Sequence, residues 1–415
     1  MVAHPSPMHR PRRRRRHATA GTATLIGCLA LLAAACSSGS GTPASTAPTT
    51  RPATSGGTAD LGRIHHVFLI VLENQGYDAT FGNPAADPYL ASTLPAQGAL
   101  LSNYYATGHL SNDNYIALIS GQAPNPLNQA DCQTFVDFPS TATVAADGQI
   151  SGSGCVFPTS VQTVAGQLDQ THHTWKGYME DMGNLPSREA AVCAHPPIGA
   201  PDPTQRAVAG DGYATRHDPF VYFHSIIDDT SRCDSHVVPL GSPTGSLRAA
   251  APAGTTALAT DLKSVATTPN FSMIVPNLCN DGHDAPCVNQ PASPDALTNV
   301  DAFLQTWVPL ITGSPAFKQD GLLEVTFDEA DTGDAAACCN ETPGPASPYP
   351  GINGPGGGRV GSVLLSPFIA GHTTTAVPYN HYATLGTIED IFGLPRLGQA
   401  KSVSAVFGKD VFSGG

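Results

Sequence analysis

Four short runs of apolar, largely β-branched residues stand out along the chain, and each of them stops at polar residues. These runs are His66–Leu72, Asn270–Pro276, Gly321–Phe327 and Val360–Leu365. Nearly continuous apolar runs of this length are typical of strands that are buried on both faces, as in a parallel sheet. The pattern therefore predicts a mostly parallel sheet at the centre of the fold.

Segments with helical periodicity lie between these runs. They predict helices over Asn114–Ser120, Ser160–Gln170, Thr255–Val265, Asp295–Ile311 and Tyr382–Phe392, with Ser160 and Asp295 as N-caps. Strands that alternate with helices indicate an α/β fold, here a three-layer sandwich with a mostly parallel central sheet. In open α/β sheets, ligands bind beyond the carboxyl ends of the strands, so the polar residues at those ends are the first candidates for a site.

The first residues have the features of an export signal. The basic run Arg12–Arg16 precedes an apolar stretch from Ala18 to Ala35, and Cys36 follows directly. We predict a lipoprotein-type signal peptide over residues 1–36, with a lipidated Cys36 that tethers the exported protein to the membrane. The alternatives are an ordinary signal peptide cleaved after an alanine, and a twin-arginine signal at Arg15–Arg16.

The next segment, residues 37–60, consists mostly of Ser, Thr, Gly, Pro and Ala. It cannot bury enough apolar surface to offset the entropy of ordering, so we predict a disordered linker. The folded part is then residues 61–415, which we predict to be the catalytic domain. This length suits one large α/β domain, although it would also allow two smaller ones.

The predicted domain is strongly acidic. It carries 13 Lys and Arg residues against 32 Asp and Glu residues, which gives a formal charge of −19. A body of this charge has no electrostatic footprint for nucleic acid, so we exclude nucleic acid as a partner. A bound cation would neutralise part of the negative charge.

Eight cysteines remain when Cys28 and Cys36 are set aside. An even number in a protein predicted to leave the cytoplasm indicates disulfides. We expect the pairs Cys132–Cys155, Cys193–Cys233 and Cys279–Cys287, while the adjacent Cys338 and Cys339 form either a vicinal pair or bonds with more distant thiols. We set a zinc site aside because the spacing lacks paired Cys-x-x-Cys units.

Acidic and amide side chains follow three of the predicted strands. They are Glu73 and Asn74, then Asn277, Asp281 and Asp284, and finally Asp328 and Glu329. Like charges gathered at one sheet edge are costly unless they are protonated or held by a cation. Oxygen ligands with some imidazole suit a divalent metal ion, which we predict here. The alternative is that each acid merely caps its strand at the surface.

Ser111 precedes the first predicted helix. The segment Gly108–Tyr115 runs into the apolar turn Ile116–Gly121, which places Ser111 at a helix N-terminus. Unpaired backbone N–H groups and the helix dipole favour a phosphate group at such a position. The simpler alternative is that Ser111 is only an N-cap.

Several segments together resemble the motifs of one family. They are His65–Tyr77, His109–Tyr115, His217–Phe223, Pro276–Asp284, Thr326–Glu329 and Tyr379–Tyr382. In this order they resemble the bacterial phosphoesterase family that holds acid phosphatases and phospholipases C, within the alkaline-phosphatase-like superfamily. The resemblance spans residues 64–398 and implies an alkaline-phosphatase-like fold.

The resemblance implies a role for each matching residue. The implied metal ligands are Glu73, Asn74, Ser111, Asp328 and Glu329. The implied catalytic residues are Ser111, Asn114, His283 and His381. Ser111 is the implied nucleophile, which forms a phosphoseryl intermediate, and Asn114 is implied to hold the phosphoryl oxygens. His283 and His381 are implied to be ligands or the proton donor to the leaving group.

Three positions depart from the pattern of that family. Its nucleophile segment is usually His-Pro-Ser-x-Pro-Asn-Tyr, whereas here Leu110 and Asp113 replace the two prolines. Glu329 stands where the second acid of the pair is usually Asp. These changes loosen the turn before the helix, add a negative charge beside the phosphate and alter the reach of one ligand.

The remaining histidines and one long loop have weaker signals. We predict that His65, His66, His172 and His173 are structural or exposed. His217 either faces the substrate or locks a loop. The Gly-, Pro- and Ala-rich segment Thr332–Gly358 is predicted to be a loop that borders the site as a lid or rim.

These features predict an exported, metal-dependent phosphoesterase that hydrolyses phosphomonoesters through a serine. The first motif, Glu73–Tyr77, resembles the acid phosphatase branch, which makes a phosphoinositide a candidate substrate. One alternative is a phospholipase C-type phosphodiesterase. The other is a non-catalytic, lipid-anchored binding protein on a phosphatase scaffold.

Overall fold

The computed structural model describes residues 59–248, 251–293, 295–339 and 341–412. The predicted signal peptide, with Cys36, and the predicted linker up to residue 58 lie outside the described residues. Across these ranges, no helix combines the length and the apolar character that a membrane span requires.

The described residues form a central sheet of eight strands in the order β5-β4-β6-β1-β7-β8-β2-β9. Neighbouring strands run parallel throughout, except that β8 is antiparallel to both β7 and β2. The strands are β1 (His66–Leu72), β2 (Ala99–Leu101), β4 (Trp175–Met179), β5 (Val237–Pro239), β6 (Phe271–Val275), β7 (Gly321–Phe327), β8 (Ser362–Leu365) and β9 (Thr373–Thr375). Two short strands, β3 (Tyr104–Tyr105) and β10 (Tyr379–Asn380), pair separately.

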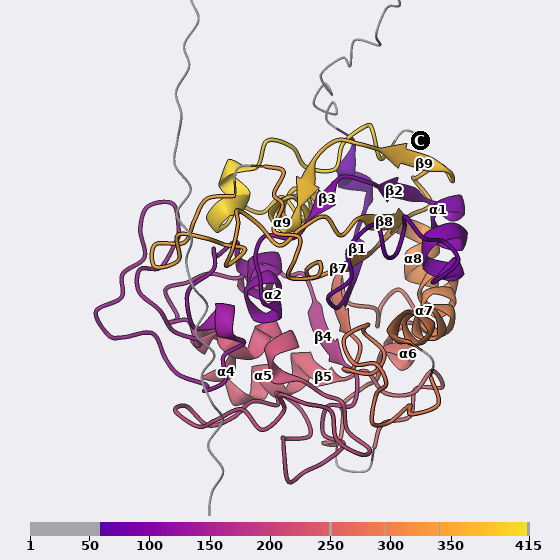
Figure 1. The fold of residues 1–415 in the computed structure, drawn as a ribbon. Helices are drawn as coiled ribbons and strands as arrows, with labels where there is room; N and C mark the ends of the chain where they lie inside the picture. The colour runs from indigo at the N-terminus through magenta and orange to yellow at the C-terminus, as the bar shows by residue number, and fades with distance from the viewer. Residues whose placement is uncertain (1–58, 249–250, 294, 340, 413–415) are drawn as a thin grey trace, which may run out of the picture. The chain divides into compact units, whose positions relative to one another are not determined.

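The helices cover both faces of this sheet (Figure 1). Figure 1 shows α2 and α9 on one side of β1 and β7, and α7 and α8 on the other. The helices are α1 (Leu94–Gln97), α2 (Ser111–Ser120), α3 (Val164–Gln170), α4 (His224–Ile227), α5 (Thr230–His236), α6 (Leu258–Asp261), α7 (Ala296–Gly313), α8 (Pro315–Asp320) and α9 (His381–Ile391). The predicted three-layer α/β sandwich with a mostly parallel sheet is confirmed.

Short 3₁₀-helices and one short π-helix, η2, join several of these elements among the described residues. They are η1 (Leu61–Arg63), η2 (Tyr89–Thr93), η3 (Asn128–Ala130), η4 (Thr215–His217), η5 (Pro219–Tyr222) and η6 (Gly398–Ser402).

The predicted strands agree closely with the observed ones where both faces are buried. β1 and β7 begin and end at the predicted residues, and all seven residues of each are buried. The run Val360–Leu365 forms β8, but this strand runs against its neighbours. Its direction depends on the route of the preceding long loop, which the apolar pattern does not contain.

Two of the predicted helices have different bounds in the structure, because side-chain hydroxyls bond backbone groups at their ends. Ser160 is not an N-cap, since Thr163 Oγ1 accepts the first free N–H, that of Gly166, at 3.1 Å. The prediction over Thr255–Val265 is reduced to the short α6. There the hydroxyls of Thr267 and Thr268 donate to the carbonyl oxygen of Asp261, at 2.8 and 3.0 Å, and stop the helix.

Asp295 is the N-cap of α7, as predicted, because its carboxylate accepts the N–H of Thr298 at 2.8 Å. The helix that carries Ser111 differs from the others in its burial. All ten residues of α2 are buried, including the polar Asn112, Asp113 and Asn114 of its first turn. Buried polar residues at a helix start normally need partners within the protein or from a bound group, which marks this end as a candidate site.

The three predicted disulfides are confirmed. Cys132 pairs with Cys155, Cys193 with Cys233, and Cys279 with Cys287. The remaining alternative is decided in favour of the vicinal pair Cys338–Cys339. Four disulfides in the described residues fit a protein that matures in an oxidising compartment.

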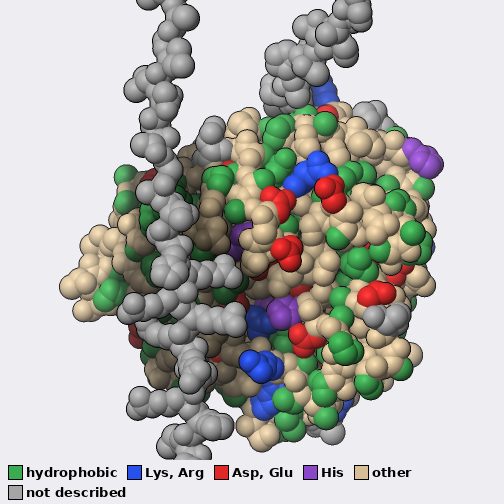
Figure 2. Space-filling model, in the orientation of Figure 1, with side chains coloured by type: hydrophobic (Ala, Val, Ile, Leu, Met, Phe, Trp, Pro, Cys, Tyr) green, Lys and Arg blue, Asp and Glu red, His purple; other side chains and the backbone are tan. Residues whose placement is uncertain are grey.

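Charged side chains occupy only part of the face seen in Figure 2. On the face seen in Figure 2, acidic, basic and histidine side chains gather in a band through the middle, and the surrounding surface is largely uncharged. Several acidic groups are instead buried, among them Asp87, Glu324 and Glu389, each at most 3% exposed.

These three buried carboxyl groups make the stability of the fold depend on pH. Burial raises the pKa of Asp87 and of Glu324 to about 7 and that of Glu389 to about 8. The unfolded chain loses these protons near pH ~4, so between pH ~4 and ~8 the free energy of unfolding falls as the pH rises. We expect the melting temperature, measured by calorimetry with chelator present, to be higher at pH 5 than at pH 8, by on the order of 5 °C.

Glu389→Gln is the control for this prediction, because the amide cannot ionise and should reduce the difference between the two pH values. A melting temperature that is equal at both pH values, or higher at pH 8, would contradict the assignment of these groups as buried neutral acids.

Candidate active site

Polar side chains from the ends of three neighbouring strands meet the first turn of α2. Glu73 follows β1, Asp281 lies in the loop after β6, and Asp328 follows β7. Ser111 is the first residue of α2, and His217 is the last residue of η4. All five are at most 2% exposed, so the parallel sheet gathers them in the interior rather than at the surface.

Glu73 is the centre of this group. The Ser111 hydroxyl donates to Glu73 Oε2 at 2.7 Å, and the Tyr115 hydroxyl donates to Glu73 Oε1 at 2.5 Å. Ser111 and Tyr115 are four residues apart on one helix, so they present both hydroxyls on the same face. Burial, together with the charges of Asp328 and Asp281, raises the pKa of Glu73 well above its usual range.

His217 stands between Glu73 and Asp281. Its Nε2 lies 3.3 Å from Glu73 Oε2, and its Nδ1 lies 3.5 Å from Asp281 Oδ2. Its ring stacks on that of Tyr115, with 5.2 Å between the centroids. One ligand atom from each of Glu73, His217 and Asp281 lies within 4.8 Å of the others, which makes this trio a candidate metal site. His217, left open by the sequence, therefore faces the site.

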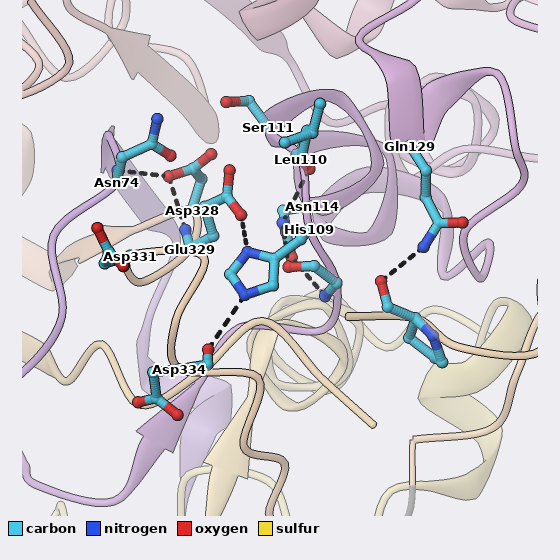
Figure 3. Close-up of polar contacts among 12 residues, drawn as sticks. Asn74, His109, Leu110, Ser111, Asn114, Gln129, Asp328, Glu329, Asp331 and Asp334 are labelled. Carbon is cyan, nitrogen blue, oxygen red and sulfur yellow. Dashed lines mark hydrogen bonds and ion pairs between the residues drawn. The ribbon is translucent and has the colours of Figure 1, made fainter. Parts of the chain in front are cut away.

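Two backbone N–H groups hold the Asp328 side chain, one just after β1 and one from the residue that follows Asp328. Its Oδ1 accepts the N–H groups of Asn74 at 3.0 Å and of Glu329 at 2.6 Å, as Figure 3 shows. Asn74 can turn toward Asp328 because it adopts a left-handed backbone with φ of 56°, which Asn tolerates. Burial raises the pKa of Asp328 to about 6, although these bonds and the Ser111 hydroxyl oppose the rise.

Glu329 points to a different partner. Its Oε2 contacts Nδ1 of His109, and His109 Nε2 lies 3.1 Å from the carbonyl oxygen of Asp334 (Figure 3). Glu329, predicted to be a metal ligand, is thus engaged by His109 in this structure. The contact of His109 with Asp334 also joins the loop before α2 to the long loop Thr332–Gly358.

That long loop borders the segment before Ser111. The N–H of His109 donates to the carbonyl oxygen of Pro350 at 3.1 Å, and that of Gly357 donates to Ala106 at 3.2 Å. Gln129 donates to the carbonyl oxygen of Pro350 as well, at 2.6 Å (Figure 3). The loop is therefore a wall of the site on the side of His109.

Asn114 has all its hydrogen-bonding capacity occupied by the loop before α2. Its Oδ1 accepts the N–H groups of Thr107 and Gly108, each at 3.0 Å. Its Nδ2 donates to the carbonyl oxygens of Gly108 at 2.9 Å and of Leu110 at 3.2 Å. Asn114, predicted to hold phosphoryl oxygens, thus fixes the loop that leads to Ser111. In the family pattern, the prolines of this segment would help to fix the same turn.

The two predicted catalytic histidines differ in exposure. His283 has a third of its side chain exposed, with Nδ1 2.8 Å from Asp284 Oδ1, and its ring centroid lies 6.4 Å from that of His217. His381 is fully buried, and both ring nitrogens have partners, Tyr104 at 3.0 Å and the carbonyl oxygen of Asp328 at 2.6 Å. His283 is therefore placed at the mouth of the site, whereas His381 lies behind it.

Sequence reasoning missed three residues that shape the site, Tyr115, His109 and Arg216. The spacing of four residues from Ser111 was a usable signal for Tyr115. Arg216 is 3% exposed, and its Nε lies 3.8 Å from Asp131 Oδ2. Its charge opposes the rise of the Glu73 pKa. Nothing in the local sequence marks it apart from its place before His217.

Asp113, which replaces a proline of the family pattern, is completely buried in the first turn of α2. Neither carboxylate oxygen has a hydrogen-bond partner among the described residues. Burial and the nearby acid Glu329 raise its pKa well above the usual range. The carboxyl group packs against Gly108, where a Cβ would lie only 2.7 Å from both Asp113 oxygens. Gly108 therefore has no room for a larger residue.

Comparison with known proteins assigns the chain to a family. The model of the Phosphoesterase family matches residues 85–395. The phosphate-repressible acid phosphatase of Penicillium chrysogenum is 28% identical over 333 residues, which cover 80% of this chain and 59% of that protein. The phosphatidylinositol-3-phosphatase of Mycobacterium tuberculosis is 24% identical over 345 residues, which cover 82% of this chain and 81% of that protein.

The chain spans about three fifths of the length of the fungal relative from Penicillium chrysogenum. Among solved structures, a protein of the alkaline phosphatase superfamily from Vibrio parahaemolyticus aligns with a TM-score of 0.45 and 14% identity, covering 84% of this chain and 71% of that one. The family match covers most of the chain and includes Ser111, His217, Asp281 and Asp328. The chain belongs to the Phosphoesterase family.

Proposed function

We propose that the protein is an exported, metal-dependent phosphatase in which Ser111 attacks phosphomonoesters. One observation carries the proposal: the Ser111 hydroxyl bonds Glu73 at 2.7 Å within a group of buried carboxylates at the strand ends. A serine that served only as an N-cap would bond a backbone N–H of its own helix, whereas Ser111 is the first helical residue and makes no such bond among the described contacts.

The donor set fits a divalent cation. Around Glu73, several buried polar atoms have no hydrogen-bond partner among the described residues: Asn74 Oδ1, Asp281 Oδ2, Asp328 Oδ2 and both ring nitrogens of His217. Buried polar atoms of this kind normally have a partner, and carboxylate, amide and imidazole atoms are ligands of divalent cations. Glu73, His217 and Asp281 are the trio closest to ligand geometry, and Asn74 and Asp328 adjoin it. When bound, a cation would lower the pKa of the Ser111 hydroxyl and stabilise charge on the phosphoryl oxygens.

The reaction that these residues support is a transfer of the phosphoryl group to Ser111 and then to water. Ser111 Oγ forms the new bond to phosphorus, its proton passes to the Glu73 carboxylate that it faces, and the bond to the leaving oxygen breaks. His283, at the solvent-exposed mouth, is the candidate that protonates the leaving alkoxide. Water then cleaves the phosphoseryl ester and releases inorganic phosphate.

Two buried groups support the anionic substrate from the protein side. Arg216 adds a positive charge beside Asp131 and close to the Glu73 carboxylate. The N-terminus of α2 directs its first backbone N–H groups toward the same region, although that of Asn112 is taken by Asp131 at 3.1 Å. Both features favour a dianionic phosphate monoester over a less charged diester.

The relatives suggest the kind of substrate. Two of them are named as an acid phosphatase and as a phosphatidylinositol-3-phosphatase, and the second matches over most of its own length. A phosphoinositide is accordingly one substrate to test. Export is proposed from the Arg-rich and apolar start of the chain and from the four disulfides. The tether through Cys36 belongs to the same proposal.

Cation binding can be measured without turnover. We expect metal-free protein to bind Mn²⁺ or Zn²⁺ in calorimetric titrations, and Asp281→Asn and Asp328→Asn each to weaken binding by about 10-fold to 100-fold, because each removes a charged ligand. Asp78→Asn is the matched control, since the Asp78 side chain is 93% exposed and, within the described part of the chain, pairs only with Arg359. Equal affinity in all three variants would argue against a cation at this site.

Hydrolysis of four substrates tests the reaction class. We expect the protein to release phosphate from an aryl phosphate monoester faster than it cleaves the matching diester or phosphatidylcholine, with phosphatidylinositol 3-phosphate as a lipid monoester. Chelator should abolish the activity, and Ser111→Ala should lower kcat by roughly 10³-fold or more.

Ser120→Ala is the control for the serine, because Ser120 ends the same helix and its hydroxyl bonds only nearby backbone groups among the described residues: it donates to the carbonyl oxygen of Ile116 at 2.7 Å and accepts the N–H of Gln122 at 3.3 Å. A preference for phosphatidylcholine would assign the protein to the phospholipase C type instead. Tight binding of phosphate esters without any turnover would indicate a binding protein on a phosphatase scaffold.

A further inference from the structure

A row of buried polar side chains connects the middle of β7 with its carboxyl end by way of α9 and β3. Glu324 Oε1 in β7 lies 2.9 Å from Thr384 Oγ1, which lies 2.6 Å from the hydroxyl oxygen of Tyr104. That oxygen is 3.0 Å from His381 Nδ1, and His381 Nε2 is 2.6 Å from the carbonyl oxygen of Asp328. We call Glu324, Thr384, Tyr104 and His381 the β7 relay; each of the four is at most 3% exposed.

The β7 relay is complete only if one of its ends supplies a hydrogen. Three contacts join the four side chains, and each contact needs one hydrogen between its two heavy atoms. Thr384 and Tyr104 bring one hydroxyl hydrogen each. The third hydrogen must therefore come from a protonated Glu324 or from Nδ1 of His381.

The His381 end cannot supply that hydrogen without placing a charge in the interior. A carbonyl oxygen only accepts, so Nε2 of His381 must already carry a hydrogen for its contact with Asp328. A second hydrogen on Nδ1 would create an imidazolium ion on a side chain that is 0% exposed. Burial disfavours the charged form of both end groups, whereas a protonated Glu324 with a neutral His381 leaves the whole relay uncharged.

We propose that Glu324 is a positioning residue that acts as a neutral acid, donating to Thr384 and thereby fixing His381 in its neutral form with the hydrogen on Nε2. That hydrogen holds the carbonyl oxygen of Asp328, whose carboxylate accepts the N–H of Asn74. The relay thus sets the place of Asp328 at the end of β7. The effect of the relay on catalysis rests on the proposed function, whereas the protonation state of His381 does not depend on it.

The surroundings of Glu324 keep it in the acid form up to neutral pH. Ser362 from β8 and Thr384 from α9 bond it, Tyr104 from β3 lies beside it, and its β1 neighbour Leu69 is apolar. None of these groups carries a charge, so burial dominates and raises the pKa of Glu324 to about 7. Below that pH the relay is complete. Above it, an ionised Glu324 only accepts, and one contact of the relay lacks its hydrogen.

The form of His381 can be read by NMR. In protein labelled with ¹⁵N at histidine, long-range ¹H–¹⁵N correlations distinguish a protonated ring nitrogen from a bare one, and the signal absent from His381→Gln is that of His381. We expect the neutral Nε2–H form at pH 6 and a shift of the signal as the pH passes about 7. In Glu324→Gln, the amide donates to Thr384 at every pH, so we expect the Nε2–H form with no shift up to pH 9.

Tyr104→Phe should move the His381 signal at every pH, because it removes the donor to Nδ1. Glu389→Gln is the matched control: it removes another buried acid of α9, one that accepts the N–H of Leu397, and should leave the signal unaltered. In hydrolysis of a phosphate monoester, kcat of the wild type should fall along an alkaline limb by about tenfold per pH unit. Glu324→Gln should move that limb to higher pH.

The proposal is overturned if the wild-type signal of His381 passes pH 7 unchanged, or if Glu324→Gln shifts in the same way as the wild type. Since the NMR readout needs no turnover, an absence of phosphatase activity would overturn the proposed function and leave the β7 relay intact.

Discussion

The burial of several carboxyl groups beside one hydroxyl is the constraint on which the rest of the structure depends. Glu73, Asp281 and Asp328 are each 0% exposed, and their mutual repulsion is not screened by water. Burial is the largest cause of the raised pKa of each of the three acids, and for Glu73 the charges of Asp328 and Asp281 add to it. Such a group is stable only if protons or a cation neutralise it, and a cation leaves Ser111 beside a strong positive charge.

The scaffold meets this constraint by holding Asp281 and Asp328 through backbone N–H groups and Glu73 through the hydroxyls of Ser111 and Tyr115. Parallel strands end at one edge of the sheet, so β1, β6 and β7 deliver their acids to one place. The N–H groups of Asn74 and Glu329 bind Asp328, and the side chain of Asn114 fixes the loop before Ser111. These supports are themselves buried, which is why a site built on strand ends can stay rigid without a preset proline turn.

The sequence predicts the scaffold better than the side-chain partners. β1 and β7 are predicted residue by residue because strands covered on both faces require continuous apolar runs. Glu73 and Asp328 lie close together because these parallel strands end at one edge. The short strands β2 and β9 have only three residues each and leave no pattern. The partners of Asn114, Glu329 and His381 depend on contacts between distant segments, as with His381 and Asp328, 53 residues apart. No local pattern records such a choice.

The most direct test of the account is an anomalous diffraction map from crystals grown with Mn²⁺. The account predicts one strong peak at about 2–2.5 Å from a carboxylate oxygen of Glu73, with further ligands from among Asn74, His217, Asp281 and Asp328, and with Ser111 Oγ facing the peak. A map with Mn²⁺ bound only at exposed carboxylates, and with no peak among Glu73, His217, Asp281 and Asp328, would contradict it.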